Sequence, residues 1–282
     1  DAVIFKEASA SPSLTFNDFW ESSPANVIGG PDPVGVSGNI SADPQFENAA
    51  LGLYQIKAGS PCIDATSILV TTAMDHDNRT RPFDGDGNGS AISDMGAYEY
   101  GTGPLMLTGM RQAYELAVGR QIALPYRVVN GVSLGSFFVQ DWDRKQGLKV
   151  TSANPPSAAR VVTVTGVLSD ALGYRTLSAS AWTSTDTAFA FSPPIDLTLS
   201  HVADQIGLNT VGLVVSVTGG VESLESDGFW LGIGGLHLTR IYCDPAQRPA
   251  FGKTCTVTGA VDRDGSNRII RTRGAWDIVV QN

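Results

Sequence analysis

The later two thirds of the chain contain an internal repeat. The segment VTVTGVL at residues 162 to 168 recurs as CTVTGAV at residues 255 to 261, an offset of 93. The offset persists outside these segments, because Arg175 aligns with Arg268. Self-similarity at a fixed offset indicates two copies of one domain. We therefore predict a duplicated domain.

Each copy has the pattern of short alternating strands. The first contains QIALPYRVV, SFFVQDWD, GLKVT, VVTVTGVLS and RTLSASAWT, and the second contains GLVVSVTGGV, FWLGIGG, KTCTVTGAV and NRIIRTRGAWDIVV. Alternation of apolar and polar residues is typical of half-buried strands. The chain has 31 glycines and 15 prolines, which favours short strands joined by turns over long helices. We predict an all-β protein in which each copy forms a small β-barrel.

The first hundred residues carry a different pattern. It runs DPQF, an alternating strand, GSPCIDA, RPFDGDGNG and finally DMGAYEY. This string resembles the closing stretch of bacterial secreted right-handed parallel β-helix proteins, in the group known as choice-of-anchor Q domains. The resemblance implies a short parallel β-helix, or solenoid, and an extracellular or cell-surface location. It implies a fold and a location rather than an activity.

The repeated segments have a resemblance of their own. SFFVQDWDRKQGLKV, VTVTGVL and GLNTVGLVVSVTGGVESLESDGFWLGIG resemble paired OB-fold-like modules that follow such β-helices in some bacterial surface proteins. This implies five-stranded barrels whose ligand face lies on the second and third strands. We predict a β-helix end at 1–102, an OB-like barrel at 103–195, a linker at 196–205 and a second barrel at 206–282.

Aromatic residues lie on those second and third strands. They are Phe137, Phe138 and Trp142 in the first copy and Phe229 and Trp230 in the second. Adjacent residues on a strand point to opposite faces, so one of each adjacent pair is expected in a core. The other side chain serves either interface packing or stacking on a ligand.

Charge is distributed unevenly along the chain. Residues 1 to 104 carry four basic and fourteen acidic side chains, a net charge of −10, and the remainder carries fifteen basic and fourteen acidic ones, a net charge of +1. Nucleic-acid-binding barrels combine stacking aromatics with a basic groove, so a nucleic-acid partner is not favoured. No run of about 18 apolar residues is present, so no membrane span is predicted.

One loop has the pattern of a calcium site. DGDGNGSAISD places Asp84, Asp86 and Asn88 at alternating positions, as in the first half of an EF-hand loop. The twelfth position is Met95 and the nearest acid is Asp94, so we predict a calcium site formed by these three residues and Asp94. Neighbouring loops offer further carboxylates: Asp75, Asp77 and Glu99. The alternative is an Asp/Gly turn whose side chains bond their own backbone.

Patterns of catalytic residues are scarce. The three histidines, at 76, 201 and 238, lie in separate segments and the sequence has no HExxH motif, so we predict that the chain is not an enzyme. Cys243 and Cys255 are candidates for a disulfide in an oxidising exterior. Free buried cysteines are the alternative.

These features favour a non-enzymatic extracellular structural subunit. The exposed end of a solenoid presents unpaired backbone groups that invite another chain, and head-to-tail contacts that do not close propagate into filaments. We expect self-assembly into a filament, sheath or surface layer by strand addition. The alternatives are a cell-surface glycan-binding module and the C-terminal piece of a carbohydrate-active β-helix enzyme.

Overall fold

A computed structural model of the chain divides it into two compact units, Asp1–Gly103 and Pro104–Asn282. The residues that the structure describes are 4–5, 7, 11–23, 25–67, 72–101, 103–170, 172–188, 193–197, 210–233, 236–265 and 267–281. Most regular elements among them are β-strands, which confirms the prediction of an all-β protein. Much of the expected linker at 196–205 lies outside the described residues, as does most of the segment 1–10.

The first unit contains two small sheets. Strands β1 (Ile4–Phe5) and β2 (Val27–Ile28) run parallel, with Ile4 opposite Val27. Strand β3 (Phe46–Asn48) is followed by the 3₁₀ turn η1 (Ala49–Leu51) and pairs antiparallel with β4 (Leu53–Ile56). A single parallel bridge joins Asp18 to Ile40. A continuous solenoid is not formed by the described part of this unit.

Buried polar groups stabilise the loops of the first unit, because short strands leave many backbone groups without ladder partners. The side chain of Asn39 is buried, and its Nδ2 donates to the carbonyl oxygens of Leu14 and Val36 at 2.7 and 2.8 Å. Its Oδ1 accepts from the backbone N–H of Asn17 at 2.9 Å. A small apolar core lies nearby, formed by Ile56, Cys62 and Met95.

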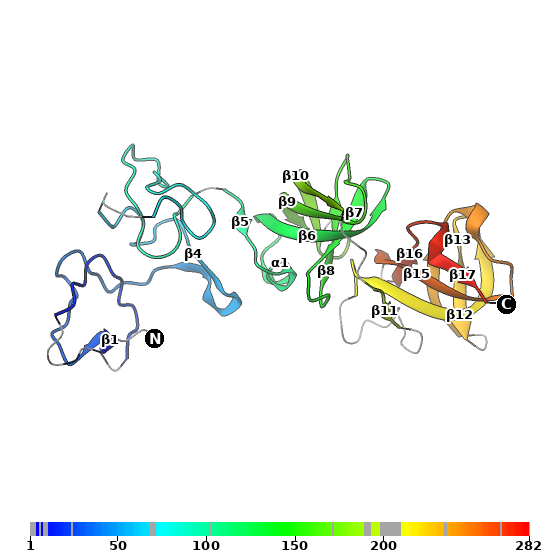
Figure 1. Ribbon diagram of the computed structural model, residues 1–282, viewed down its shortest axis with the longest axis horizontal. Helices are drawn as coiled ribbons and strands as arrows, with labels where there is room; N and C mark the ends of the chain where they lie inside the picture. The colour runs from blue at the N-terminus through cyan, green and yellow to red at the C-terminus, as the bar shows by residue number, and fades with distance from the viewer. Residues whose placement is uncertain are drawn as a thin grey trace. The chain divides into compact units, whose positions relative to one another are not determined.

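The second unit begins with a closed five-stranded barrel (Figure 1). Its elements are β5 (Leu105–Met106), α1 (Met110–Glu115), β6 (Gln121–Ser133), β7 (Ser136–Gln140), β8 (Gly147–Thr151), β9 (Arg160–Ser169) and β10 (Thr176–Ala188). The order is β6-β7-β8-β10-β9, and β9 pairs with β6 to close the barrel. Only the β8–β10 pairing within the barrel is parallel. Strand β5 adds to β6 in parallel from outside the ring.

A second barrel with the same strand order follows (Figure 1). Its elements are β11 (Ile195–Asp196), β12 (Val214–Glu225), β13 (Gly228–Ile233), β14 (Leu236–Tyr242), η2 (Pro245–Gln247), β15 (Thr254–Asp264), β16 (Asn267–Arg271), η3 (Ala275–Asp277) and β17 (Ile278–Val280). The order is β12-β13-β14-β16-β15, closed by pairing of β15 with β12. Strand β11, where the linker was expected to begin, pairs in parallel with β12 as β5 does with β6.

The repeat offset of 93 is maintained in the pairing registers. Gly166 of β9 lies opposite Ile122, and Gly259 of β15 lies opposite Val215. Both glycines are required by a close approach of the backbone. A Cβ atom on Gly166 would lie 2.3 Å from the carbonyl oxygen of Ser178, and one on Gly259 would lie 2.4 Å from that of Arg271. Any side chain at these positions would therefore push the neighbouring strand away.

The two copies differ at their last strand. Strand β10 pairs with β9 along most of its length, although with register shifts. In the second copy β16 ends at Arg271, and after η3 a separate strand, β17, pairs with β15 at Cys255 to Val257. In the first copy one long strand, β10, pairs along β9. In the second copy two strands, β16 and β17, pair with different parts of β15.

Alternating residues of the strands fill each barrel. Fully buried side chains of the first barrel include Leu124, Phe137, Val150, Val164 and Leu177, and those of the second include Val215, Phe229, Leu231, Val257 and Ile270. Burying a side chain of this kind contributes about 1.5 to 3 kcal/mol. Among the described residues, no helix has the length and apolar character needed to cross a membrane.

Candidate functional site

Three carboxylates of the first unit converge, and this acidic cluster consists of Asp64, Asp84 and Asp86. One oxygen of each lies within 4.8 Å of the others. The loop between them is held by its own side chains: Asp84 accepts from the backbone N–H groups of Gly87 and Gly89, at 2.8 and 2.9 Å. The arrangement thus combines the predicted acidic loop with the Asx turns of the alternative interpretation.

Electrostatic repulsion acts within the acidic cluster. Burial raises the pKa of Asp64, and the carboxylate of Asp86 raises it further. The backbone N–H of Asn88 instead lowers the pKa of Asp86. The Oδ1 atom of Asp64 is buried and accepts no well-aligned hydrogen bond from the described residues. A hard cation coordinated by these oxygens would relieve the repulsion.

The other two predicted calcium ligands are used differently. Asn88 donates from Nδ2 to Asp86 at 2.9 Å, and its Oδ1 accepts from the N–H of Ser90 at 2.8 Å. Asp94 is buried outside the acidic cluster, where its carboxylate accepts from the N–H groups of Asp64 at 2.7 Å and of Tyr100. Burial raises the pKa of Asp94 to about 6. Asp94 therefore positions Asp64, which sequence analysis did not single out.

A buried ion pair supports the same loops. Arg81 Nε lies 2.7 Å from Glu99 Oε1, and both side chains are nearly inaccessible to solvent. Glu99 also accepts from the N–H groups of Phe83 and Asp94, each at 3.1 Å. Arg81 donates in addition to the carbonyl oxygen of Gly96 at 2.7 Å. The RPFDGDGNG and GAYE segments are thus joined by this pair.

The remaining acids considered for calcium lie outside the acidic cluster. Asp75 accepts from the N–H of Arg79 at 2.7 Å and from that of Glu99 at 2.9 Å. Asp77 accepts from the side chain of Gln55 at 3.1 Å, and burial raises the pKa of Asp77. Both therefore act as hydrogen-bond acceptors within the fold.

The predicted aromatic residues fall into different environments. Phe137 and Phe229 are fully buried in the barrel cores, and Phe138 is buried as well. Trp230 is half-buried and donates from Nε1 to Glu225 at 2.8 Å. Trp142 is exposed in the turn after β7. Of the five, Trp142 is the most accessible to a ligand.

A buried carboxylate joins the two barrels, and sequence analysis missed it. The Asp262 side chain, on β15, has no exposed surface. It accepts from Lys149 Nζ of β8 at 2.8 Å, from the hydroxyl of Tyr174 at 2.7 Å and from Arg271 Nε at 2.6 Å. Burial alone would raise the pKa of Asp262, but the bonds from Lys149 and Arg271 lower it on balance. The sequence around it, DRDG, resembles an ordinary exposed turn.

The backbones of the barrels also meet at this interface. A Cβ atom on Gly147 would lie 2.5 Å from the carbonyl carbon of Gly212, so only glycine fits there. The Nδ2 of the buried Asn130 donates to the carbonyl oxygen of Gly212 at 3.1 Å. At this point the backbones of Gly147 and Gly212 leave no space for a side chain, and the bond from Asn130 adds a polar contact between the barrels.

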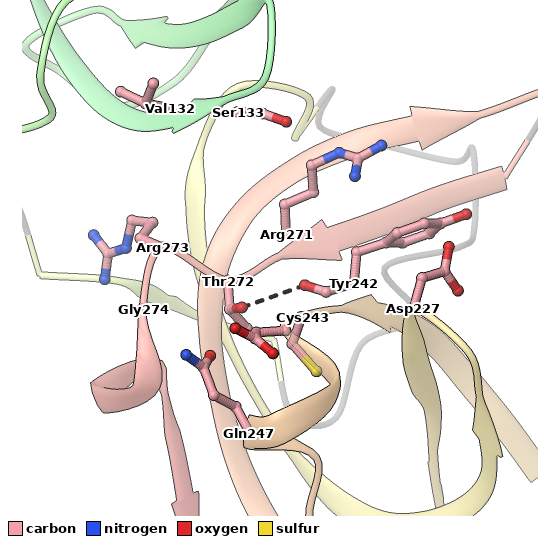
Figure 2. Close-up of a pocket in the computed structure, with 11 residues that line it drawn as sticks. Val132, Ser133, Asp227, Tyr242, Cys243, Gln247, Arg271, Thr272, Arg273 and Gly274 are labelled. Atoms are coloured by element: carbon pink, nitrogen blue, oxygen red, sulfur yellow. Dashed lines mark hydrogen bonds between the residues drawn. The ribbon is translucent and has the colours of Figure 1, made fainter.

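A cavity of about 360 Å³ lies beside this interface. Figure 2 shows Val132 and Ser133 of the first barrel across from Tyr242 and Arg271 of the second. The ring of Tyr242 is flanked by the guanidinium groups of Arg240 and Arg271, at 4.2 and 4.5 Å from its centroid. The ring of Tyr242 therefore already makes two cation–π contacts within the protein.

The three cysteines are free thiols in the structure. Cys255 is buried in the core of the second barrel, and Cys243 packs against the same core. Burial raises the pKa of Cys255 to about 11, and burial also raises that of Cys243. The disulfide between Cys243 and Cys255 stays a prediction. Cys62 lies in the small core of the first unit.

No protein-family model matches this sequence, and no significant match was found among curated proteins or solved structures.

Proposed function

We propose that the chain is a non-enzymatic, extracellular structural subunit that assembles with copies of itself. The observation that carries the proposal is the two-stranded parallel sheet of β1 and β2, whose outer edges have no strand partner among the described residues. A sheet this small is marginal in water, and its free N–H and C=O groups are suited to pairing with a strand of another copy. A filament, sheath or surface layer would result.

Two parallel pairings in the first unit support the solenoid part of this proposal, although its described residues form no continuous solenoid. The parallel pairings join Ile4 to Val27 and Asp18 to Ile40, so successive passes of the chain are separated by nearly the same number of residues. Asn17 and Asn39 also bond to each other through their side chains at 3.0 Å. The closed five-stranded barrels support the OB-like assignment.

The interface at Asp262 supports a structural role for the two barrels. The buried carboxylate of Asp262 favours association of the two barrels, because moving Lys149 away from it would leave a buried charge without one of its partners.

Assembly is tested by sedimentation velocity and negative-stain microscopy of the purified chain over a range of concentrations. We expect large particles from the wild type and their loss in Ile4→Pro, because the N–H of Ile4 donates to Asn26 O at 3.2 Å and proline has no donor. Ser11→Pro, in an exposed loop, is the matched control and should assemble normally. A wild-type chain that stays monomeric at high concentration would refute the proposal.

We propose calcium as the ligand of the acidic cluster. A ligand that binds only the folded state adds about 2.7 kcal/mol to the free energy of unfolding when its free concentration is about 100 times its Kd. Calcium should therefore raise the melting temperature of the first unit, and a chelator should lower it. Asp64→Asn should remove this difference. Asp43→Asn changes an exposed turn acid that accepts from Gln45 N at 2.8 Å and should retain it. If calorimetry shows no effect of chelation, the proposal is refuted, and the loop is a set of Asx turns without a bound cation.

A second candidate function is glycan binding at the cell surface. The exposed Trp142 of the first barrel favours it, since the rings of the other predicted aromatic residues are partly or fully buried.

A further inference from the structure

Two aromatic side chains project from neighbouring points of the first barrel, and we call them the Tyr126–Trp142 pair. Tyr126 is 61% exposed and Trp142 is 53% exposed. The indole Nε1 of Trp142 donates to the carbonyl oxygen of Tyr126 at 2.9 Å. Trp142 is therefore fixed against the strand that carries Tyr126, and both rings present apolar surface to solvent.

A buried ion pair holds the backbone beneath the rings. Arg127 follows Tyr126, Asp141 precedes Trp142, and Arg127 Nε lies 3.0 Å from Asp141 Oδ1. Arg127 also donates to the carbonyl oxygen of Thr108 at 2.7 Å, and Asp141 accepts from Met110 N at 2.8 Å. Because Arg127 and Asp141 adjoin Tyr126 and Trp142 in the chain, the ion pair links the two backbone segments that carry the rings.

Tyr126 has an unfavourable backbone conformation. Its φ is +55°, at an irregularity in the pairing of β6 with β9 between Leu124 and Arg127. A bulky residue with positive φ is a true outlier and costs on the order of 1 to 3 kcal/mol. Glycine would adopt this conformation without strain. Tyr126 therefore places an exposed aromatic ring at a position whose backbone conformation suits glycine better.

We infer that the Tyr126–Trp142 pair binds a neutral polysaccharide. Aromatic rings combine an apolar body with a polar group, which suits the apolar C–H face and the hydroxyl groups of a sugar ring. Thr163 places a hydroxyl beside Tyr126, whose N–H donates to it at 3.4 Å. The inference does not depend on self-assembly, since both rings belong to the first barrel.

Charge and size favour a neutral polysaccharide over other partners. In the turn that carries Trp142, Asp143 and Lys145 form an ion pair at 3.3 Å and Arg144 adds a single positive charge, while the whole chain has a net charge of −9. A single-stranded nucleic acid would need a basic groove beside the rings. A stable protein partner would need an interface of roughly 1,200 Å² or more, far larger than two side chains offer.

The test is affinity gel electrophoresis of the full chain in gels containing hydroxyethylcellulose, galactomannan or soluble starch. We expect at least one polymer to retard the wild type. Trp142→Ala and Tyr126→Gly should each weaken the apparent affinity at least tenfold. Tyr126→Gly should also melt at the same temperature as the wild type or higher, which separates loss of binding from loss of folding. Trp276→Ala removes a ring that is 68% exposed on the second barrel and should leave retardation unchanged.

Two results would overturn the inference. One is a wild-type chain that none of the three polymers retards. The other is retardation that persists in both Trp142→Ala and Tyr126→Gly, which would place any sugar-binding site elsewhere. Loss of self-assembly in Ile4→Pro, by contrast, should leave retention by the polymer intact.

Discussion

Asp262→Ala is expected to reduce the free energy of unfolding of the two-barrel unit by about 3 to 5 kcal/mol, the range for removal of one partner from a buried ion pair. Alanine would leave Lys149 and Arg271 without the carboxylate that they share, and the hydroxyl of Tyr174 would lose its acceptor. Urea unfolding followed by tryptophan fluorescence measures the change.

Two control variants make this prediction specific. Asp143→Ala removes an exposed carboxylate paired with Lys145 and should change stability by less than about 1 kcal/mol. The double variant Asp262→Leu with Lys149→Met removes the carboxylate and one of its two cations and leaves the partly exposed Arg271, so it should recover part of the loss. A loss below about 1 kcal/mol for Asp262→Ala would show that the barrels do not depend on this carboxylate.

The first barrel shows why the carboxylate belongs to the interface. The position equivalent to Asp262 at the offset of 93 is Ser169, and the position equivalent to Gly212 is Gly119. Both glycines have positive φ and donate to the equivalent strand, Gly119 to Leu168 O and Gly212 to Val261 O, each at 2.8 Å. Of these two glycines, only Gly212 lies in close contact with the backbone of the other barrel, at Gly147 and Leu148. The repeat thus conserves the fold of each barrel, while the acid occurs only where the barrels meet.

Glu99→Ala is expected to destabilise the first unit by a similar amount, about 3 to 5 kcal/mol. The variant leaves the buried guanidinium of Arg81 without its partner and deprives the N–H groups of Phe83 and Asp94 of an acceptor. Thermal unfolding monitored by circular dichroism should show an earlier transition for this unit. Because the pair joins the loops that carry the acidic cluster, any effect of calcium on stability should weaken as well.

The matched control for Glu99→Ala is Glu115→Ala. Glu115 pairs with Arg111 on the exposed face of α1 at 2.7 Å, and exposed pairs of this spacing contribute about 0.3 to 0.5 kcal/mol. Equal melting curves for Glu99→Ala and the wild type would mean that the closing segments are held together by other contacts.

Local pattern was enough to predict the strands and the repeat. Apolar alternation is a property of neighbouring residues, so segments such as VTVTGVL indicated β-structure without knowledge of their partners. The offset of 93 predicted equivalent copies, and Gly166 and Gly259 occupy equivalent registers. The opposite orientation of adjacent residues predicted that one of each aromatic pair is in a core, and the structure buries Phe229 of one pair and both Phe137 and Phe138 of the other.

The identity of the charged and exposed groups at each site was decided by tertiary structure. Asp64 joins Asp84 and Asp86 because Asp94, the expected ligand, instead holds the backbone of Asp64. Asp262 is buried because Lys149, 113 residues earlier in the chain, faces it across the barrel interface. Neither fact follows from spacing, since turn paths and barrel docking determine which distant carboxylates meet which cations. The sequence by itself determined most of the barrel strands and the repeat, because apolar alternation is a local property. Strand β14 was not among the predicted strands, and the convergence of distant polar groups required the folded chain.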